Sequence, residues 1–367
     1  MPFLMKKRLL KLLFFSGLFG GVLFPAGAQI DSTEKAEWRL FPIAYANPQS
    51  GFGLGLGGLT TFFWGQDTTL RPSLLQGTGS YTTKNQLLTY LSWDIFTGPQ
   101  PYYFTGEAGY YHYSYRFHGL GNFTEYADYE IFQYHLIRFW SSYLRRLGDR
   151  PQYLGLRWNF DHWYRLQLAE GGKLARGELP GTQGATTSSL GLLYQWDTRE
   201  PVYFPTGGHF LRVALLHQGP YTGASYENSR VALQFNYFQE LPWGGILAGQ
   251  WQSLHIGGPR VAYFDLGLIG GRRTLRGYYY GRFRGRHLQS YRLAYRQPLF
   301  NRWAAVLFGG AGRATETWQA LWPARFHTAG GLGIRFRPIL SSSLHIRFDL
   351  AWGDGPMQLY FGIGEAF

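Results

Sequence analysis

Apolar and polar side chains alternate along most of the chain, beginning near residue 39. From Leu344 to Trp352 every second residue is apolar, and the residues between them include a histidine, an arginine and an aspartate. The same period of two recurs at residues 154–161, 231–237 and 291–296. Successive side chains of a β-strand point to opposite faces, so this period predicts strands with one apolar face. We therefore expect an all-β fold.

Turn residues divide the alternating region into about 16 strands, an even number as in single-chain bacterial barrels. Individual boundaries are expected to shift by a few residues. The expected strands are residues 39–46, 52–64, 73–81, 87–96, 102–117, 129–144, 152–168, 186–197, 209–218, 226–239, 246–255, 288–298, 304–313, 328–337, 343–352 and 357–367.

Two all-β architectures fit this alternation, a soluble sandwich and a transmembrane antiparallel β-barrel. In a barrel one strand face meets lipid and the other lines the lumen, where charged residues are tolerated. The chain is long for one sandwich, and Tyr, Trp and Phe gather near strand ends, as in the interfacial girdles of membrane barrels. We therefore predict a transmembrane barrel over residues 39–367.

The connections are expected to differ between the two sides of the barrel. Counted from a periplasmic start, tight turns at residues 241–245 and 299–303 lie on the inner side, with others at 97–101 and 338–342. Most long connections lie on the outer side, at residues 118–128, 169–185 and 315–327. Short periplasmic turns and longer extracellular loops are typical of outer-membrane barrels. The insertion at about 257–287 is then a long extracellular loop.

The N-terminus resembles a secretory signal. Four basic residues precede an apolar stretch at 12–24, and Ala26-Gly27-Ala28 forms a small-residue cleavage site. The apolar stretch is too short to span a bilayer comfortably, so a single membrane anchor is the less favoured interpretation. Cleavage after residue 28 leaves residues 29–38 as a short periplasmic segment, with no room for a folded periplasmic domain.

Composition narrows the function classes. Beyond the N-terminus the chain has no run of about 20 apolar residues, which excludes a helical membrane bundle. Hydrophobic residues make up 45% of the chain and charged residues 16%, which excludes disorder. Cysteine is absent, which excludes a disulfide scaffold and an N-terminal lipid anchor through cysteine. The formal charge of +13 falls to +9 once the signal is removed.

Enzyme motifs are weak or absent. The chain has no His-Glu-x-x-His, no Gly-x-Ser-x-Gly and no thiol nucleophile. Alternate glycines from Gly51 to Gly57 favour close packing inside a barrel over a phosphate loop. Asp161 and His162 are neighbours on one strand, so they point to opposite faces. We expect no enzyme activity, no cofactor, no metal site and no nucleic-acid partner.

The 257–287 loop is the strongest local feature because it carries six arginines between residues 272 and 286. Such a loop could lie in solvent, bind lipopolysaccharide phosphates, or fold into the lumen and pair with inward carboxylates. Arginine suits the last two roles because its planar fork makes bidentate bonds. The lumen is favoured because alternation already points three candidate partners inward: Asp349, Asp197 and Asp161.

Four segments of the chain carry recognisable motifs. Gly-Gly is followed by Leu-Arg-Gly-Tyr at 270–278, and a strand follows at 291–299. Residues 197–208 contain an Asp-x-Arg and Pro-x-x-Gly turn, and the chain ends in Ile-Gly-x-x-aromatic at 363–367. Together these segments resemble the BamA/TamA-type bacterial surface antigen family of outer-membrane assembly and translocation barrels. The family residues matched are Gly270, Gly271, Arg276, Gly277, Tyr278, Asp197, Arg199, Pro205, Gly208 and Phe367.

The resemblance implies a 16-stranded barrel whose loop enters the lumen, where its arginine pairs with an acidic wall residue. That arginine would be Arg276. The wall motif Phe-x-Asp-x-Gly is present at 308–312, except that Gly310 replaces the acidic residue, so Asp349 becomes the expected partner. The family's periplasmic POTRA domains have no counterpart in residues 29–38. A barrel-only member is therefore expected.

The resemblance also implies a role in inserting or assembling outer-membrane proteins, or in translocating polypeptides. The closing seam between first and last strands would open, because Pro42 lacks an N–H donor and Gly362 and Gly364 weaken the last strand. The alternative interpretation of these residues is that Pro42 precedes the first paired residue and that the glycines relieve crowding. The alternative function is a passive structural or pore-forming barrel subunit of an outer-membrane complex. Expected partners are outer-membrane lipid and lipopolysaccharide, unfolded outer-membrane protein clients and separate periplasmic accessory chains.

Overall fold

A computed structural model describes residues 38–63, 73–97, 101–201, 204–338 and 345–367. The predicted signal peptide and almost all of residues 29–38 lie outside these ranges. So do parts of the predicted turns at 97–101 and 338–342.

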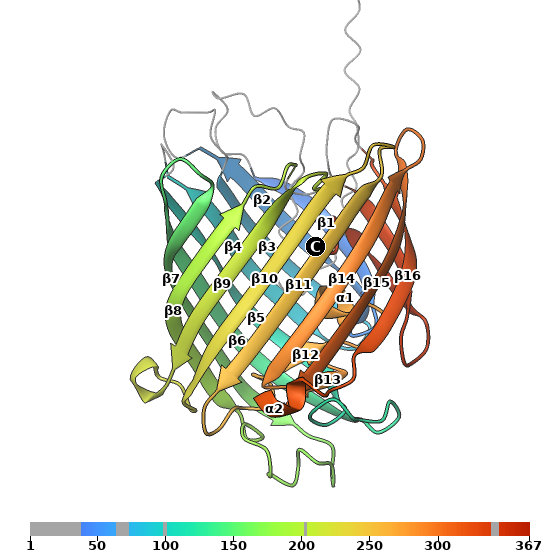
Figure 1. Cartoon of the computed structure of the whole chain (residues 1–367). Coiled ribbons are helices and arrows are strands. Elements are labelled where there is room, and N and C mark those ends of the chain that lie inside the picture. The colour runs from blue at the N-terminus through green and yellow to red at the C-terminus, as the bar shows by residue number, and fades with distance from the viewer. Residues whose placement is uncertain (1–37, 64–72, 98–100, 202–203, 339–344) are drawn as a thin grey trace, which may run out of the picture.

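The described strands form a closed barrel of 16 antiparallel strands, as the alternation predicts (Figure 1). Each barrel strand pairs with its neighbours in the chain, except that β11 pairs with β14 across an insertion and β18 closes onto β1. No helix in the described part of the chain is long and apolar enough to cross a membrane. The barrel strands are β1 (Arg39–Asn47), β2 (Gly51–Phe62), β3 (Ser73–Thr82), β4 (Leu87–Phe96), β5 (Tyr102–Phe117), β6 (Glu130–Arg146), β7 (Gln152–Gln167), β8 (Ala185–Asp197), β9 (Gly208–Gln218), β10 (Asn228–Glu240), β11 (Ile246–Gly257), β14 (His287–Pro298), β15 (Trp303–Thr315), β16 (His327–Phe336), β17 (Ile346–Trp352) and β18 (Gln358–Ile363).

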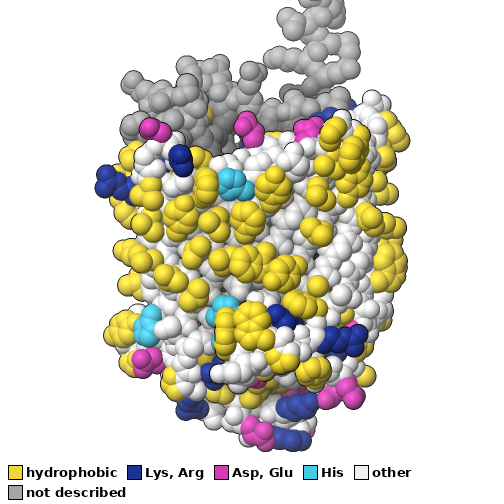
Figure 2. Space-filling model, viewed as in Figure 1, with side chains coloured by type: hydrophobic (Ala, Val, Ile, Leu, Met, Phe, Trp, Pro, Cys, Tyr) yellow, Lys and Arg dark blue, Asp and Glu magenta, His cyan; other side chains and the backbone are white. Residues whose placement is uncertain are grey.

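Strand β17 shows how the sequence period produces the two faces of the wall. Phe348 and Trp352 are 47% and 45% exposed on the outside, whereas Arg347, Asp349 and Ala351 are fully buried on the inside. Apolar side chains cover the middle of the outer wall, and most charged side chains gather toward the two ends (Figure 2). Charge on the lipid face costs about 2 to 4 kcal/mol at mid-membrane, so this distribution suits a membrane-spanning wall.

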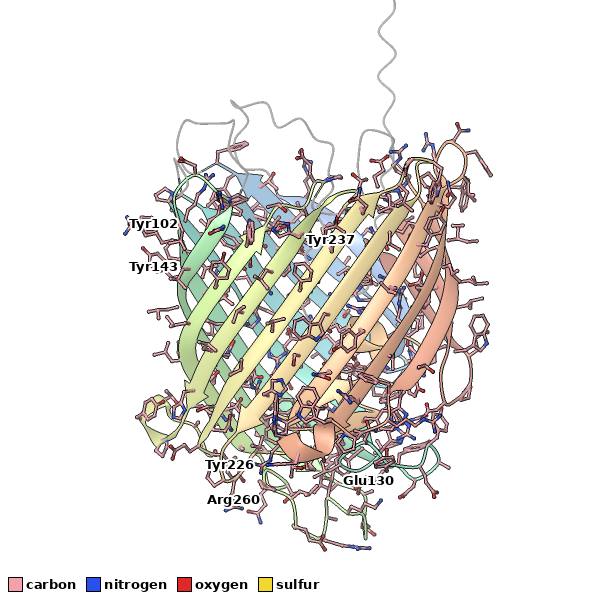
Figure 3. All side chains as sticks on the ribbon, in the orientation of Figure 1. Tyr102, Glu130, Tyr143, Tyr226, Tyr237 and Arg260 are labelled. Atoms are coloured by element: carbon pink, nitrogen blue, oxygen red, sulfur yellow. The ribbon has the colours of Figure 1, made fainter. Side chains whose placement is uncertain are left out.

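Aromatic rings are placed near both ends of the barrel. Tyr102, Tyr143 and Tyr237 lie near one rim (Figure 3), and the rings of Tyr102 and Tyr143 stack at 5.4 Å. At the opposite rim, in the connection after β9, the exposed ring of Tyr221 stacks on His217 at 5.7 Å. Amphipathic rings at both interfaces are typical of membrane barrels.

The two rims carry different connections. We call the end that bears the connections 118–129, 168–184, 258–286 and 316–326 the loop rim, and the opposite end the turn rim. The turn rim carries mainly tight turns, such as 241–245 and 299–302. The longest described connections follow the predicted asymmetry. Residues 48–50, 83–86 and 353–357 depart from it, because they form short connections on the loop rim.

The glycine run at 51–57 lies against aromatic side chains on the inside of the wall. A Cβ on Gly53 would lie 2.5 Å from the ring of Tyr45, and one on Gly57 would lie 2.3 Å from the ring of Phe41. Both rings are almost fully buried. These glycines therefore allow close packing.

One predicted boundary is wrong by four residues. The last strand was expected to reach Phe367, but β18 ends at Ile363. Gly364 adopts φ +75°, a left-handed conformation that turns the chain off the strand. The last residues then lie inside the barrel, where the ring of Phe367 packs 6.4 Å from that of Phe238.

Candidate functional site

The long loop lies inside the barrel and has its own structure. It contains the strand pair β12 (Gly267–Ile269) and β13 (Phe283–Gly285), with the short helix α1 (Gly271–Thr274) between them. All three lie behind the wall strands, and the pair lies toward the loop rim (Figure 1). Ile269 and Phe283 are buried with Leu288 and Ala314 of the wall. The loop is thus a packed plug.

Three glycines of the loop motif have backbone conformations that favour glycine. Gly270 has φ +118°, and a Cβ there would lie 1.9 Å from the carbonyl oxygen of Tyr279. Gly277 has φ +101°, and a Cβ there would lie 2.5 Å from the carbonyl oxygen of Trp352. Gly271 is also left-handed, with φ +67°. The Gly-Gly motif therefore allows a tight turn of the loop backbone. The glycine of the Arg-Gly motif allows the loop backbone to approach the wall closely.

The side chain of Arg276 contacts both a carboxylate and an aromatic ring of the barrel wall. Its Nη1 lies 2.6 Å from Asp349 Oδ2, and both side chains are almost completely buried. Its guanidinium carbon lies 3.4 Å from the centre of the Phe308 ring, a cation–π arrangement.

The two residues after Arg276 also bind the wall. Gly277 donates its N–H to Tyr360 Oη of β18 at 3.2 Å. Tyr278 Oη donates to the carbonyl oxygen of Thr328 at 3.1 Å.

Asp349 belongs to a larger group that we call the lumen ion cluster. Asp349 Oδ1 lies 2.7 Å from Arg335 Nη1, and Asp349 Oδ2 lies 3.3 Å from Arg347 Nε. Arg335 also binds Glu365, with Nε 2.6 Å from Oε1. In the cluster four arginines share two carboxylates; its members are Arg276, Arg296, Arg335, Arg347, Asp349 and Glu365.

The cluster connects the loop with the turn rim. Arg296 Nε lies 3.7 Å from Glu365 Oε2. The same guanidinium donates to the carbonyl oxygens of Pro205 and Phe367, each at 3.2 Å. Contacts therefore run continuously from Arg276 to the turn after β8 and to the end of the chain.

Gly310 has a physical role where the family motif has an acid. A Cβ at this position would lie 3.1 Å from Leu275 Cδ1 of the loop and 2.8 Å from the carbonyl oxygen of Tyr291. Leu275 is 1% exposed, and its side chain occupies the space beside Gly310 on the inner face of the wall. The acidic partner is supplied instead by β17, two strands along the barrel.

The other two candidate wall partners bind arginines elsewhere. Asp161 accepts two bonds from Arg138 of β6, at 2.7 and 2.5 Å. Asp197 accepts two bonds from Arg199, each at 2.8 Å, within the turn after β8. His162 faces away from the lumen, where its Nδ1 lies 2.9 Å from Thr186 Oγ1.

The turn after β8 is closed by the residues of its motif. Arg199 stacks on the ring of Phe210 at 4.5 Å. Gly208 has φ +89°, and a Cβ there would lie 2.2 Å from the carbonyl oxygen of Thr198. Pro205 is buried and contacts the lumen ion cluster through Arg296. The motif therefore shapes a turn that reaches inward.

The seam between β1 and β18 is weakly paired. In the described part of the chain one pair of Cα partners joins the two strands, Ala46 and Phe361, whereas β1 and β2 share nine pairs. Pro42 lies in the middle of β1 with its ring exposed. Gly362 lies near the end of β18 opposite Arg347 of β17, and Gly364 lies beyond the strand.

A second loop covers the loop rim. Residues 118–129 cross to β15 and β16, where Asn122 Nδ2 donates to the carbonyl oxygen of Arg325 at 2.8 Å. Gly121 N donates to the carbonyl oxygen of Arg284 in β13 at 2.6 Å. Beside these contacts, burial and the positive charges of Arg282 and Arg284 lower the pKa of His118 to about 4.

Four of the six members of the lumen ion cluster were not predicted from the sequence: Arg296, Arg335, Arg347 and Glu365. Arg347 was placed on the inner face by alternation but given no role. The available signal was arginine at inward positions of β14, β16 and β17, because a buried charge requires a partner. Among the described residues no group of three or more His, Cys, Asp or Glu could hold a metal ion.

Comparisons with known proteins fit this geometry. The family model described as the Omp85 superfamily domain matches residues 104–367. Among solved structures, BamA from Haemophilus ducreyi lacking POTRA domains 1–3 is 14% identical with a TM-score of 0.60, covering 90% of this chain and 71% of that one. CdiB from Acinetobacter baumannii is 12% identical with a TM-score of 0.55, covering 90% of this chain and 65% of that one.

CdiB from Escherichia coli is also 12% identical, with a TM-score of 0.57, and the match covers 91% of this chain and 68% of that one. At these identities the likeness to solved structures concerns the fold. Among proteins of curated function, none matches the sequence.

Proposed function

We propose that this chain, which belongs to the Omp85 superfamily, inserts polypeptides into the outer membrane or translocates them across it. The observation that carries the proposal is the β1–β18 seam. Among the described residues one register pair, Ala46 with Phe361, joins the two strands, whereas β1 and β2 share nine. Unpaired backbone N–H and C=O groups on a strand edge form a template for another strand.

Pairing of an incoming strand at this edge requires the two strands to separate sideways. Pro42 and Gly362 lower the cost, because proline provides no N–H and glycine gives little packing. The loop rim would face outside and the turn rim the periplasm, in keeping with the usual asymmetry of loops. Unfolded outer-membrane proteins would be the clients, delivered by separate periplasmic chains. Outer-membrane lipid and lipopolysaccharide would surround the wall.

The plug argues against an open pore as the main role. The plug packs against the wall near β12 and β13, and the loop at residues 118–129 covers it at the loop rim. A passive pore would be expected to leave this path open to ions. Lateral opening leaves the plug in place.

The seam can be locked with a disulfide because the chain has no cysteine of its own. Ala46→Cys with Phe361→Cys places one cysteine on each of the two paired positions. We expect the locked double variant, expressed in native cells depleted of the original protein, to lose its activity. The readout is the outer-membrane proteome, in which several barrel proteins should fall together and recover after reduction.

The matched control is Ala108→Cys with Phe139→Cys, a paired position between β5 and β6. Locking β5 to β6 should leave the outer-membrane proteome normal, because the proposed mechanism does not require these two strands to separate. Full activity of the seam-locked barrel would overturn lateral opening. An unchanged proteome after depletion itself would favour the passive structural barrel.

A further inference from the structure

Two histidines face each other on the outer wall at the foot of the long loop. His255 lies near the end of β11 and His287 begins β14, and the two are direct cross-strand partners. They stand on the same face as Trp251 and Tyr291, four residues further along each strand. Both rings are half-buried at the loop rim, outside the lumen and away from the seam.

The distance between the two rings suits a shared ion. His255 Nδ1 and His287 Nδ1 are 3.2 Å apart. Two nitrogens bound to a tetrahedral zinc ion at about 2.0 to 2.1 Å are separated by about 3.3 Å. Without metal, one ring nitrogen donates its proton to the other. A divalent ion could take the place of that proton with the separation of the two nitrogens almost unchanged.

The surroundings hold the rings in this orientation. Ser253 Oγ lies 2.7 Å from His255 Nε2, so the nitrogen on the far side of the ring has a hydrogen-bond partner. Such a bond is typical of metal-binding histidines, because it fixes the tautomer that leaves the other nitrogen free for the ion. Trp318 packs edge-on against both rings, at 4.6 Å from His255 and 5.8 Å from His287.

Trp318 is positioned by the β15–β16 connection. It opens the short helix α2 (Trp318–Leu321), whose first turn is capped by Thr317 through a bond from Ala320 N to Thr317 Oγ1 at 3.3 Å. Arg286, the residue before His287, donates to the carbonyl oxygen of Gly258 at 2.6 Å. The rings therefore lie in a fixed setting at the edge of the wall.

We propose that His255 and His287 bind a divalent transition-metal ion such as zinc, copper or nickel. Imidazole nitrogen binds these ions more strongly than it binds calcium or magnesium, because the latter two prefer oxygen ligands. Two protein ligands leave the remaining positions to water. The ion fastens β11 to β14, and these strands are the two feet of the loop that carries Arg276. Binding therefore stabilises the base of the plug.

The test uses the full barrel in detergent, purified without a metal-affinity tag and stripped with EDTA. Zinc chloride is titrated by calorimetry, and copper(II) is examined by electron paramagnetic resonance for two nitrogen ligands. We expect one saturable zinc site per chain. We also expect His255→Gln and His287→Gln each to weaken binding more than the roughly tenfold to hundredfold typical of losing an outer-shell partner.

The matched control is His112→Gln, in the other cross-strand histidine pair on the outer wall. His112 and His135 are also direct partners, but their rings stack in parallel at 4.6 Å, and His135 Nδ1 is bonded to Tyr110 Oη at 2.7 Å. Zinc binding should be unchanged in this variant. Retention of the heat-dependent shift in gel mobility that marks folded barrels checks the folding of every variant.

Three results would overturn the proposal: no saturable zinc binding by the unmodified barrel, binding that survives in both single variants, or loss of binding in His112→Gln. A second readout is the temperature of unfolding, which zinc should raise in the unmodified chain and leave unchanged in the folded His255→Gln barrel. Neither measurement depends on insertion activity, so the site and the proposed function can fail independently.

Discussion

The junction between β5 and β6 and the seam between β18 and β1 close the same barrel by different means. Strands β5 and β6 share sixteen register pairs over almost their whole length. Strands β18 and β1 share one. The first junction joins neighbours in the chain and is stabilised by a full ladder of backbone hydrogen bonds. The second joins the two ends of the barrel and has almost no ladder.

Strand β18 is instead held from inside the lumen. It shares six register pairs with β17, its Tyr360 accepts a bond from Gly277 of the plug, and Glu365 just beyond it binds Arg335. These contacts fix the position of the strand although its ladder to β1 is short. Buried side chains inside the lumen can therefore hold a strand of the wall where backbone pairing is sparse.

Replacing Asp349 should have the largest effect on this arrangement. Asp349→Ala removes the carboxylate shared by Arg276, Arg335 and Arg347, leaving buried positive charges without compensation. Breaking a buried ion pair costs about 3 to 5 kcal/mol. We expect the plug to become sensitive to protease added outside cells, and the amides of β18 to exchange faster in the purified barrel.

Asp161→Ala is the matched control because it removes a lumenal carboxylate bound to Arg138, between strands joined by a long ladder. Exchange in β18 should stay as in the unmodified barrel. Equal protection of β18 in both variants would contradict the idea that the lumen ion cluster supports the seam.

A smaller loss is expected from Gly277→Ala. The left-handed backbone costs a non-glycine residue about 1 to 3 kcal/mol, and the added Cβ would approach the carbonyl oxygen of Trp352. The bond from Gly277 N to Tyr360 should lengthen, loosening β18 at a single point. Gly223→Ala provides the comparison, because that glycine has φ +82° with open space around its Cβ position. If both variants unfold at the same temperature, strain alone explains the effect and contact with β18 adds nothing.

Acid should have the smallest effect, confined to the loop rim. The folded loop holds His118 neutral because its pKa is lowered from 6.5 to about 4, whereas the opened loop takes up a proton below about 6.5. Docking of residues 118–129 is therefore unaffected above pH 6.5 and weakens as pH falls from about 6.5 toward 4. Proteolysis of this loop at pH 7.5 and pH 5 measures the change. His118→Gln should show the same cleavage at both values, and a pH response that persists in this variant would assign the effect to another group.

Some of these features could be read from local sequence and others could not. All 16 strands were predictable because lipid and lumen impose a strict period of two, and because turn residues mark each reversal. The end of β18 was not, because the alternating pattern continues through Gly364 and only its left-handed backbone ends the strand. The arginine-rich loop was expected in the lumen because alternation points candidate carboxylate partners inward. Its strand pair and helix α1 could not be predicted, because they are too short to show a periodic pattern.

The sequence by itself determined the wall: its strands, their inward and outward faces, and the glycines that the loop motif requires. Each depends on the residues next to one another in the chain. The tertiary structure alone decided which charges meet, because Arg276 and Asp349 are 73 residues apart and the pairing depends on barrel closure. It also decided that Leu275 fills the space beside Gly310, and that His255 meets His287. Closing the barrel brings these distant positions together, and no local pattern records which partner each will find.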